Sequence, residues 1–68
     1  MKDIRIIYGE RLKTLRKKKG LSQEELGFKS SLHRTYISEV ERGRRNISIV
    51  NIAKIAKALN VSIKEFFD

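Results

Sequence analysis

The chain has 68 residues, contains neither cysteine nor proline, and carries a formal net charge of +8 at pH 7. This length suffices for one small hydrophobic core, and the lack of cysteine excludes disulfides, thiolate metal sites and thiol nucleophiles. No apolar run approaches the roughly 18 residues of a membrane-spanning helix, and charges interrupt the N-terminal apolar stretch, which argues against a signal peptide. We therefore expect a cytoplasmic protein, which in a bacterium includes the nucleoid.

The strong basic charge is informative about the partner rather than about the fold. DNA, RNA and an acidic membrane are the polyanions that such a surface attracts, although a basic face can also serve solubility alone. An enzyme would need a nucleophile with its base, or a metal cluster, in a pocket. The sequence offers neither, so we expect no enzymatic activity, no metal, no cofactor and no small-molecule effector. Several capped breaks in the helical pattern argue against a single amphipathic membrane helix.

The first predicted helix covers about residues 3–19. Its apolar residues recur at intervals of three and four, which places the following on one helical face: Ile4, Tyr8, Leu12 and Leu15. Gly20 ends this helix after three lysines, whose charge suits the C-terminal end of the helix dipole. Ser22 then predicts an N-cap that Glu25 completes as a capping box, so a second helix is expected over residues 23–29.

A third helix is expected from His33 to Arg42, after a break at Ser30 and Ser31. Ile37 and Val40 form its inner face, whereas positions 34, 35, 38 and 39 face away from them. The turn between the second and third helices has the length found in a helix-turn-helix motif. In that motif the second helix enters the major groove of DNA, so the polar residues of the third helix are expected to form a reading face.

Two further helices complete the predicted all-α fold. The fourth covers residues 49–59 with Ser48 as its cap, and its inward residues are Ile52, Ile55, Ala56 and Leu59. Ser62 and Glu65 again have the capping-box spacing, so a fifth short helix is expected to carry Ile63, Phe66 and Phe67. The pattern therefore predicts five short helices packed compactly around one aliphatic core.

Four short motifs carry a resemblance to a known family. They are Leu21-Ser22-Gln23-Glu24-Glu25-Leu26, Tyr36-Ile37-Ser38, Glu41-Arg42-Gly43, and Ile52 to Leu59 with Val61-Ser62. In this order they resemble the helix-turn-helix of the lambda repressor and Cro type, or XRE family, from about Leu12 to Phe66. A narrower resemblance, over residues 32–38 and 45–48, is to the controller proteins of restriction–modification systems. Those proteins are small dimeric regulators of their own promoter and of the endonuclease gene. The resemblance implies a lambda-repressor-like fold and sequence-specific binding to double-stranded DNA.

Three positions depart from the pattern of that family. Gly27 stands where alanine is usual, which preserves close helix packing but costs about 1 kcal/mol of helix propensity. Ser31 stands where the turn commonly has glycine, so serine fits less well if this residue needs a positive φ. His33 stands where serine or threonine often caps the recognition helix. These departures concern the stability of the turn rather than contact with DNA.

Three residues of the third helix are expected to read DNA bases. Arg34 can bridge guanine O6 and N7 with two hydrogen bonds, and the alternative is a phosphate contact or an exposed charge. Thr35 offers a hydroxyl to a base and a methyl group to thymine, or is simply a surface residue. Glu39 matches a base-reading position of the family and can accept from cytosine N4, although it can instead pair with Arg42 or His33.

A larger polar set is expected along the DNA backbone, each member with a solvated or structural alternative. Gln23 lies at a helix N-terminus, which favours a phosphate, and the family uses this position as a backbone clamp. Arg45 can also enter a narrow minor groove. The resemblance further implies a structural ion pair between Arg16 and Glu41. The expected backbone contacts are Ser22, Gln23, His33, Tyr36, Ser38, Arg42, Arg44, Arg45 and Asn46.

The C-terminal segment has more apolar surface than so small a core needs, and family members of this length usually dimerise through it. The expected interface residues are Ile47, Ile49, Ile63, Phe66 and Phe67, and the alternative is that they close the monomer core. Two-fold dimers bind palindromic sites with half-sites near one helical turn apart. We therefore expect residues 1–68 to form one DNA-binding domain whose C-terminal part also makes a homodimer. An antitoxin-type or other XRE-type repressor whose main partner is a protein is the alternative.

Overall fold

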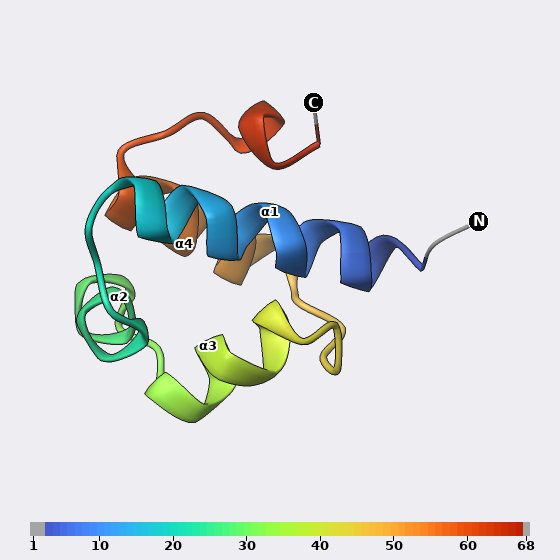
Figure 1. The fold of residues 1–68 in the computed structure, drawn as a ribbon, viewed down its shortest axis with the longest axis horizontal. Coiled ribbons are helices and arrows are strands. Elements are labelled where there is room, and N and C mark those ends of the chain that lie inside the picture. The colour runs from blue at the N-terminus through green and yellow to red at the C-terminus, as the bar shows by residue number, and fades with distance from the viewer. Residues whose placement is uncertain (1–2, 68) are drawn as a thin grey trace.

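All regular structure in the computed structural model, which describes residues 3–67, is helical (Figure 1). The elements are α1 (Ile4–Lys18), α2 (Gln23–Ser30), α3 (Arg34–Glu41), α4 (Ile49–Leu59) and a short 3₁₀ helix, η1 (Ile63–Phe66). The predicted all-α fold is confirmed, and the predicted helix ends are within about one residue of the observed ones. The expected count of five helices is slightly off, because the last element has only four residues and forms a 3₁₀ helix rather than an α-helix.

The four α-helices and η1 pack around one core. In Figure 1, α1 and α4 overlap in the upper half of the molecule, while α2 and α3 lie below and to the left. α2 packs against both α3 and α4, α1 packs against α3, and η1 covers α1 and α4. This arrangement leaves the lower side of α3 without another element of the described chain over it, so its outer face is open to a partner.

The core is aliphatic with two aromatic residues at one end. Its members are Tyr8, Leu12, Leu15, Leu26, Ile37, Val40, Ile55, Ala56, Leu59 and Phe66. The helical periodicity identified most of these positions correctly, because one face of each helix must be buried. Ile4 is an error of that prediction: it is 59% exposed because the first turn of α1 extends past the other helices (Figure 1).

Side-chain caps begin each of the four α-helices. The Ser22 hydroxyl accepts from the Glu25 backbone N–H at 3.0 Å, and the Glu25 carboxylate accepts from the Ser22 N–H at 2.8 Å, which is the predicted capping box. The hydrogen bond from the Ser22 backbone also lowers the pKa of Glu25. At α3, His33 Nδ1 accepts from the Thr35 N–H at 3.1 Å, so histidine does cap the recognition helix. Asp3 and Ser48 cap α1 and α4 in the same way.

The turn between α2 and α3 explains two of the departures from the family pattern. Ser31 has φ 60° and ψ 35°, so the turn does require the left-handed conformation, which costs a non-glycine residue about 1 kcal/mol. A Cβ on Gly27 would lie 2.7 Å from the Leu32 carbonyl oxygen. Glycine therefore permits a closer approach of α2 to the turn than alanine would in this backbone.

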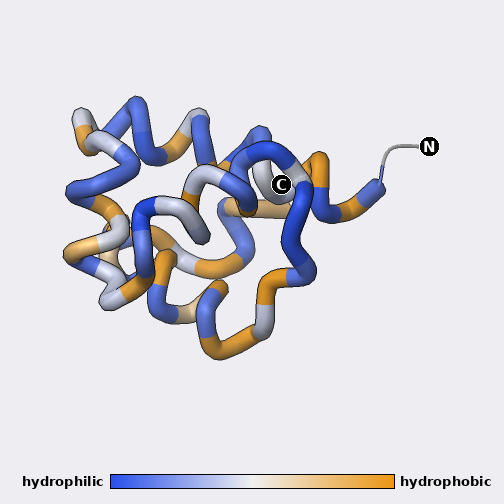
Figure 2. The backbone as a smooth tube through the Cα atoms, turned by 90° about the horizontal axis from the view of Figure 1, so that it is seen from below, coloured by the Kyte–Doolittle hydropathy of each residue, from blue (hydrophilic) through white to orange (hydrophobic). Residues whose placement is uncertain are grey.

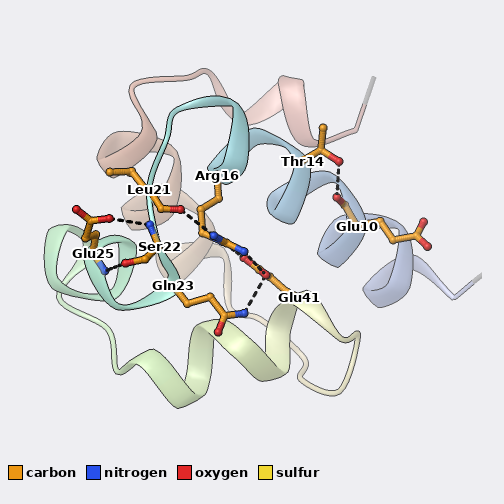
Figure 3. Close-up of polar contacts among 8 residues, drawn as sticks. All are labelled: Glu10, Thr14, Arg16, Leu21, Ser22, Gln23, Glu25 and Glu41. Atoms are coloured by element: carbon orange, nitrogen blue, oxygen red, sulfur yellow. Dashed lines mark hydrogen bonds and ion pairs between the residues drawn. The ribbon is translucent and has the colours of Figure 1, made fainter.

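A buried ion pair joins α1 to the end of α3 (Figure 3). Arg16 Nε donates to Glu41 Oε2 at 2.6 Å and Arg16 Nη2 donates to Glu41 Oε1 at 3.1 Å, and the two side chains are only 9% and 3% exposed. Arg16 Nη1 also donates to the Leu21 carbonyl at 2.7 Å. The ion pair that the resemblance implied is thus present, in a two-pronged geometry that fixes the relative orientation of α1 and α3.

Replacing Gly9 by alanine should destabilise the fold, because α1 and α3 touch through this residue. A Cβ there would lie 2.7 Å from the Glu41 carbonyl oxygen and would also meet the Val40 carbonyl. We expect Gly9→Ala to lower the free energy of unfolding by about 1–3 kcal/mol in urea denaturation. Lys13→Ala, at an exposed site of the same helix, is the control and should change it little. Equal stability of the two variants would contradict this close contact.

Removing the Glu41 carboxylate should destabilise the protein strongly, because Arg16 would then be a buried, unpaired charge. We expect Glu41→Ala to lower the free energy of unfolding by about 3–5 kcal/mol, measured by urea or thermal denaturation. Glu24→Ala removes the same charge from an exposed position of α2 and should cost far less. A loss below about 1 kcal/mol for Glu41→Ala would show that the pair has no structural role.

Candidate nucleic-acid interface

The outer face of α3 presents the residues expected to read bases. Arg34 and Thr35 are exposed in its first turn, and Ser38 and Glu39 are half-buried one turn later. Ile37 and other apolar residues of α3 are buried on the opposite face. The helix therefore separates an anchoring face from a polar outer face, as the sequence pattern predicted.

A shallow groove of about 360 Å³ joins the start of α2 to this outer face. Its lining residues are Gln23, Arg34, Thr35, Ser38 and Arg42, and each of them was expected to contact DNA. The groove thus brings together the first residue of α2 with residues of α3 and its C-cap. The outermost two, Gln23 and Arg42, are 19 residues apart in the chain. Two arginines and three neutral hydrogen-bonding groups in one groove can bind a phosphate and base edges together.

Gln23 is held in place by the buried ion pair (Figure 3). Its Nε2 donates to Glu41 Oε1 at 3.0 Å, so the carboxylate of Glu41 is shared between Arg16 and Gln23. A side-chain amide has two N–H donors, and one is left for another acceptor, such as a phosphate oxygen. The proposed backbone clamp therefore starts from an oriented side chain rather than from a freely rotating one.

Two other expected backbone residues have internal partners. Ser22 Oγ accepts the capping hydrogen bond from Glu25. The Tyr36 hydroxyl accepts from Asn51 Nδ2 at 3.1 Å, which connects α3 to the first turn of α4. Asn51 was not singled out from the sequence, because a lone polar residue near the start of a helix has no distinguishing pattern. Tyr36 is half-buried, and its hydroxyl oxygen already accepts a hydrogen bond from Asn51.

The loop after α3 is basic and folds back on the helix. Arg44, Arg45 and Asn46 are exposed. Hydrophilic segments alternate with apolar ones along the whole backbone in Figure 2. The Arg44 N–H donates to the Glu39 carbonyl at 2.9 Å, and Arg45 Nε donates to Glu39 Oε1 at 2.7 Å. The partner of Glu39 is thus Arg45 rather than Arg42 or His33, because the turn at position 43 directs the chain back along α3. Arg42 instead donates to Ser38 Oγ at 2.8 Å.

The residues expected at a dimer interface divide into two groups. Ile49, Ile63 and Phe67 are exposed and Ile47 is half-buried, so all four have surface to offer a partner. Phe66 is fully buried and stacks on Tyr8 with ring centroids 4.9 Å apart. Its assignment to the interface is wrong for this structure, because it closes the monomer core. Exposed apolar residues that the sequence reasoning did not select for the interface are Ile4, Ile6, Ile7, Phe28 and Val50.

Within residues 3–67, no group of three or more histidine or acidic side chains is arranged to hold a metal ion. No helix in the same range has both the length and the apolar character needed to cross a membrane.

Comparison with known proteins gives consistent results. The helix-turn-helix family model matches residues 12–66. The control protein C.BamHI of Bacillus amyloliquefaciens is 49% identical over 67 residues, which are 97% of this chain and 83% of that protein. C.MunI of a Mycoplasma species is 47% identical over 98% of this chain and 92% of that protein. The crystal structure of the restriction-modification controller protein C.AhdI from Aeromonas hydrophila has a TM-score of 0.91 and 52% identity, covering 93% of this chain and 96% of that one.

These matches agree with the geometry found here. The matched range begins inside α1 and ends at the last residue of η1, so it includes α2, the turn, α3 and the groove between them. The alignments with C.BamHI and C.AhdI cover most of this chain and most of each relative, so the similarity extends well beyond the motif itself. The chain therefore belongs to the helix-turn-helix family.

Proposed function

We propose that this protein is a transcription regulator that binds a palindromic DNA site as a homodimer, without an added effector. The groove lined by Gln23, Arg34, Thr35, Ser38 and Arg42 carries this proposal. α3 enters the major groove with Arg34 and Thr35 toward base edges, while Gln23 and Arg42 contact phosphates on either side. The net charge of +8 adds a sequence-independent attraction to the DNA backbone.

A second copy of the chain covers the exposed apolar residues near α4 and η1. Ile49 and Val50 are 77% and 59% exposed in the first turn of α4, and Ile63 and Phe67 are about half exposed at η1, which packs against α4. Large apolar residues exposed on neighbouring elements are typical of a protein interface. Two-fold symmetry then presents two α3 helices to successive turns of the DNA.

The relatives suggest which genes such a regulator controls. C.BamHI, C.MunI and C.AhdI carry the names of control or controller proteins, and the last is named as part of a restriction-modification system. By analogy this protein controls its own promoter and an endonuclease gene in such a system. An adjacent methyltransferase gene and endonuclease gene would support this role, and their absence would leave a helix-turn-helix regulator of other targets.

The experiment that tests DNA recognition selects bound duplexes from a random pool at about 150 mM salt, because affinity is salt-dependent. A palindromic motif with half-sites about one helical turn apart is the expected result. Enrichment of no sequence, with salt-sensitive binding only, would exclude a sequence-specific regulator.

On the selected site, Arg34→Ala should lower specific affinity by about 1–3 kcal/mol and leave non-specific affinity nearly unchanged, because a base-reading arginine contacts only the correct guanine. Electrophoretic mobility or fluorescence anisotropy on matched specific and random duplexes measures both. Lys54→Ala, an exposed cation on α4 outside the groove, is the control. Equal losses on the two DNAs would make Arg34 a phosphate contact instead.

Ile49→Glu should convert the dimer to a monomer, because it places a charge in the proposed interface. The site is 77% exposed in the first turn of α4, where an acidic residue suits the helix dipole, so the monomer should remain folded. Phe28→Glu is the matched control, since Phe28 is 88% exposed but lies on α2. Sedimentation equilibrium should show a shift for Ile49→Glu alone, with circular dichroism to verify folding. Dissociation by Phe28→Glu alone would move the interface to α2.

A further inference from the structure

Glu39 is half-buried and belongs to an arrangement that restrains one arginine of the basic loop. Its carboxylate accepts from Arg45 Nε at 2.7 Å, and the Arg45 guanidinium carbon lies 5.4 Å from the centroid of the Tyr36 ring. That distance is within the range of a cation–π interaction. The Arg44 backbone hydrogen bond to the Glu39 carbonyl holds the loop against α3 as well. Arg45 is therefore restrained by a carboxylate, an aromatic ring and the loop backbone.

This restraint lies in the part of the surface that should be most attractive to phosphates. Arg42 and Arg44 are close to Arg45 in the chain, and the pair itself is open to solvent, with side-chain exposures of 35% for Glu39 and 51% for Arg45. An exposed ion pair of this kind is weak, so a well-placed phosphate can replace the carboxylate. Glu39 contributes a negative charge that repels DNA, and it also neutralises the arginine beside it. Both effects weaken binding to DNA, so DNA affinity alone would not favour a glutamate at this position.

We propose that Glu39 is a positioning residue, which withholds Arg45 from phosphates until α3 is seated in its correct groove. This inference rests on the proposed function, because it assumes binding to DNA through α3. In a non-specific encounter the protein binds through its other cations, and Arg45 stays with Glu39 and Tyr36. In the specific complex the contacts of α3 bring a phosphate to Arg45, which leaves the carboxylate. Glu39 thus lowers the number of phosphates that the protein neutralises in a non-specific complex by about one, and with it the salt dependence of that complex. It lowers specific affinity as well, because Arg45 must leave the ion pair there.

The test measures the salt dependence of binding to a random duplex and to the selected site. Glu39→Gln removes the charge but keeps the size of the side chain. We expect it to bind the random duplex about fivefold more tightly at low salt, with a slope of log K against log salt steeper by about 0.9, which corresponds to one added phosphate contact. The slope on the selected site should stay the same, because Arg45 already contacts a phosphate there. Glu24→Gln makes the same charge change on α2 and should leave both slopes unaltered.

A second background shows whether the effect passes through Arg45. In protein that already carries Arg45→Ala, Glu39→Gln should leave the slope of log K against log salt on the random duplex unchanged. An unchanged slope for Glu39→Gln in the otherwise native protein would overturn the inference, and so would an equal effect of Glu24→Gln or persistence of the effect without Arg45. Loss of discrimination at one base pair, with an unchanged random-duplex slope, would make Glu39 a base reader instead. If the native protein prefers no sequence, the proposed function fails, and this inference fails with it.

Discussion

The buried ion pair between Arg16 and Glu41 determines the position of the recognition helix. It joins the last turn of α1 to the last residue of α3; Arg16 also donates to the Leu21 carbonyl, and Glu41 also accepts from the Gln23 amide. Burying two charges is costly unless they are paired and hydrogen-bonded, and here each guanidinium nitrogen and each carboxylate oxygen has at least one hydrogen-bond partner. Its contribution is therefore geometric: the ends of three helices cannot move independently without exposing or orphaning a charge.

Two glycines, Gly9 and Gly27, also help to position α3, because each allows a neighbouring backbone to come close. Gly9 allows α1 to lie against the end of α3, and Gly27 allows α2 to lie against the turn that leads into α3. With Ser31 in the left-handed conformation, this backbone has little freedom to rotate α3 about its axis. A base-reading helix benefits from such rigidity, because a few degrees of rotation would move a guanidinium away from its hydrogen-bonding geometry.

The basic charge of the protein is not evenly available to a ligand. Arg16 is buried in its ion pair and is not available to a ligand. Arg42 is hydrogen-bonded to Ser38. Arg45 is restrained by Glu39 and Tyr36. Of the charged residues that line the groove along α2 and α3, Arg42 thus has a defined orientation. Affinity from charge count alone and recognition from oriented groups are separate properties, and the proposed function needs both.

The sequence by itself determined the helices, their caps, the buried face of each one and the polar outer face of α3. These features depend on residues within about one turn of each other, so periodicity and capping patterns reveal them. The family resemblance added the pair of Arg16 and Glu41, which lie 25 residues apart.

Only the tertiary structure decided which polar groups meet across the turns. The partners of Glu39 and of Tyr36 depend on how the loop after α3 folds back and where α4 begins, which no local pattern encodes. The same holds for Phe66, which is equally apolar in a core or an interface, and for Ile4, whose helical face extends past the elements that would bury it. Burial is decided by what lies opposite a side chain in space, and that is a property of the packed fold rather than of the segment.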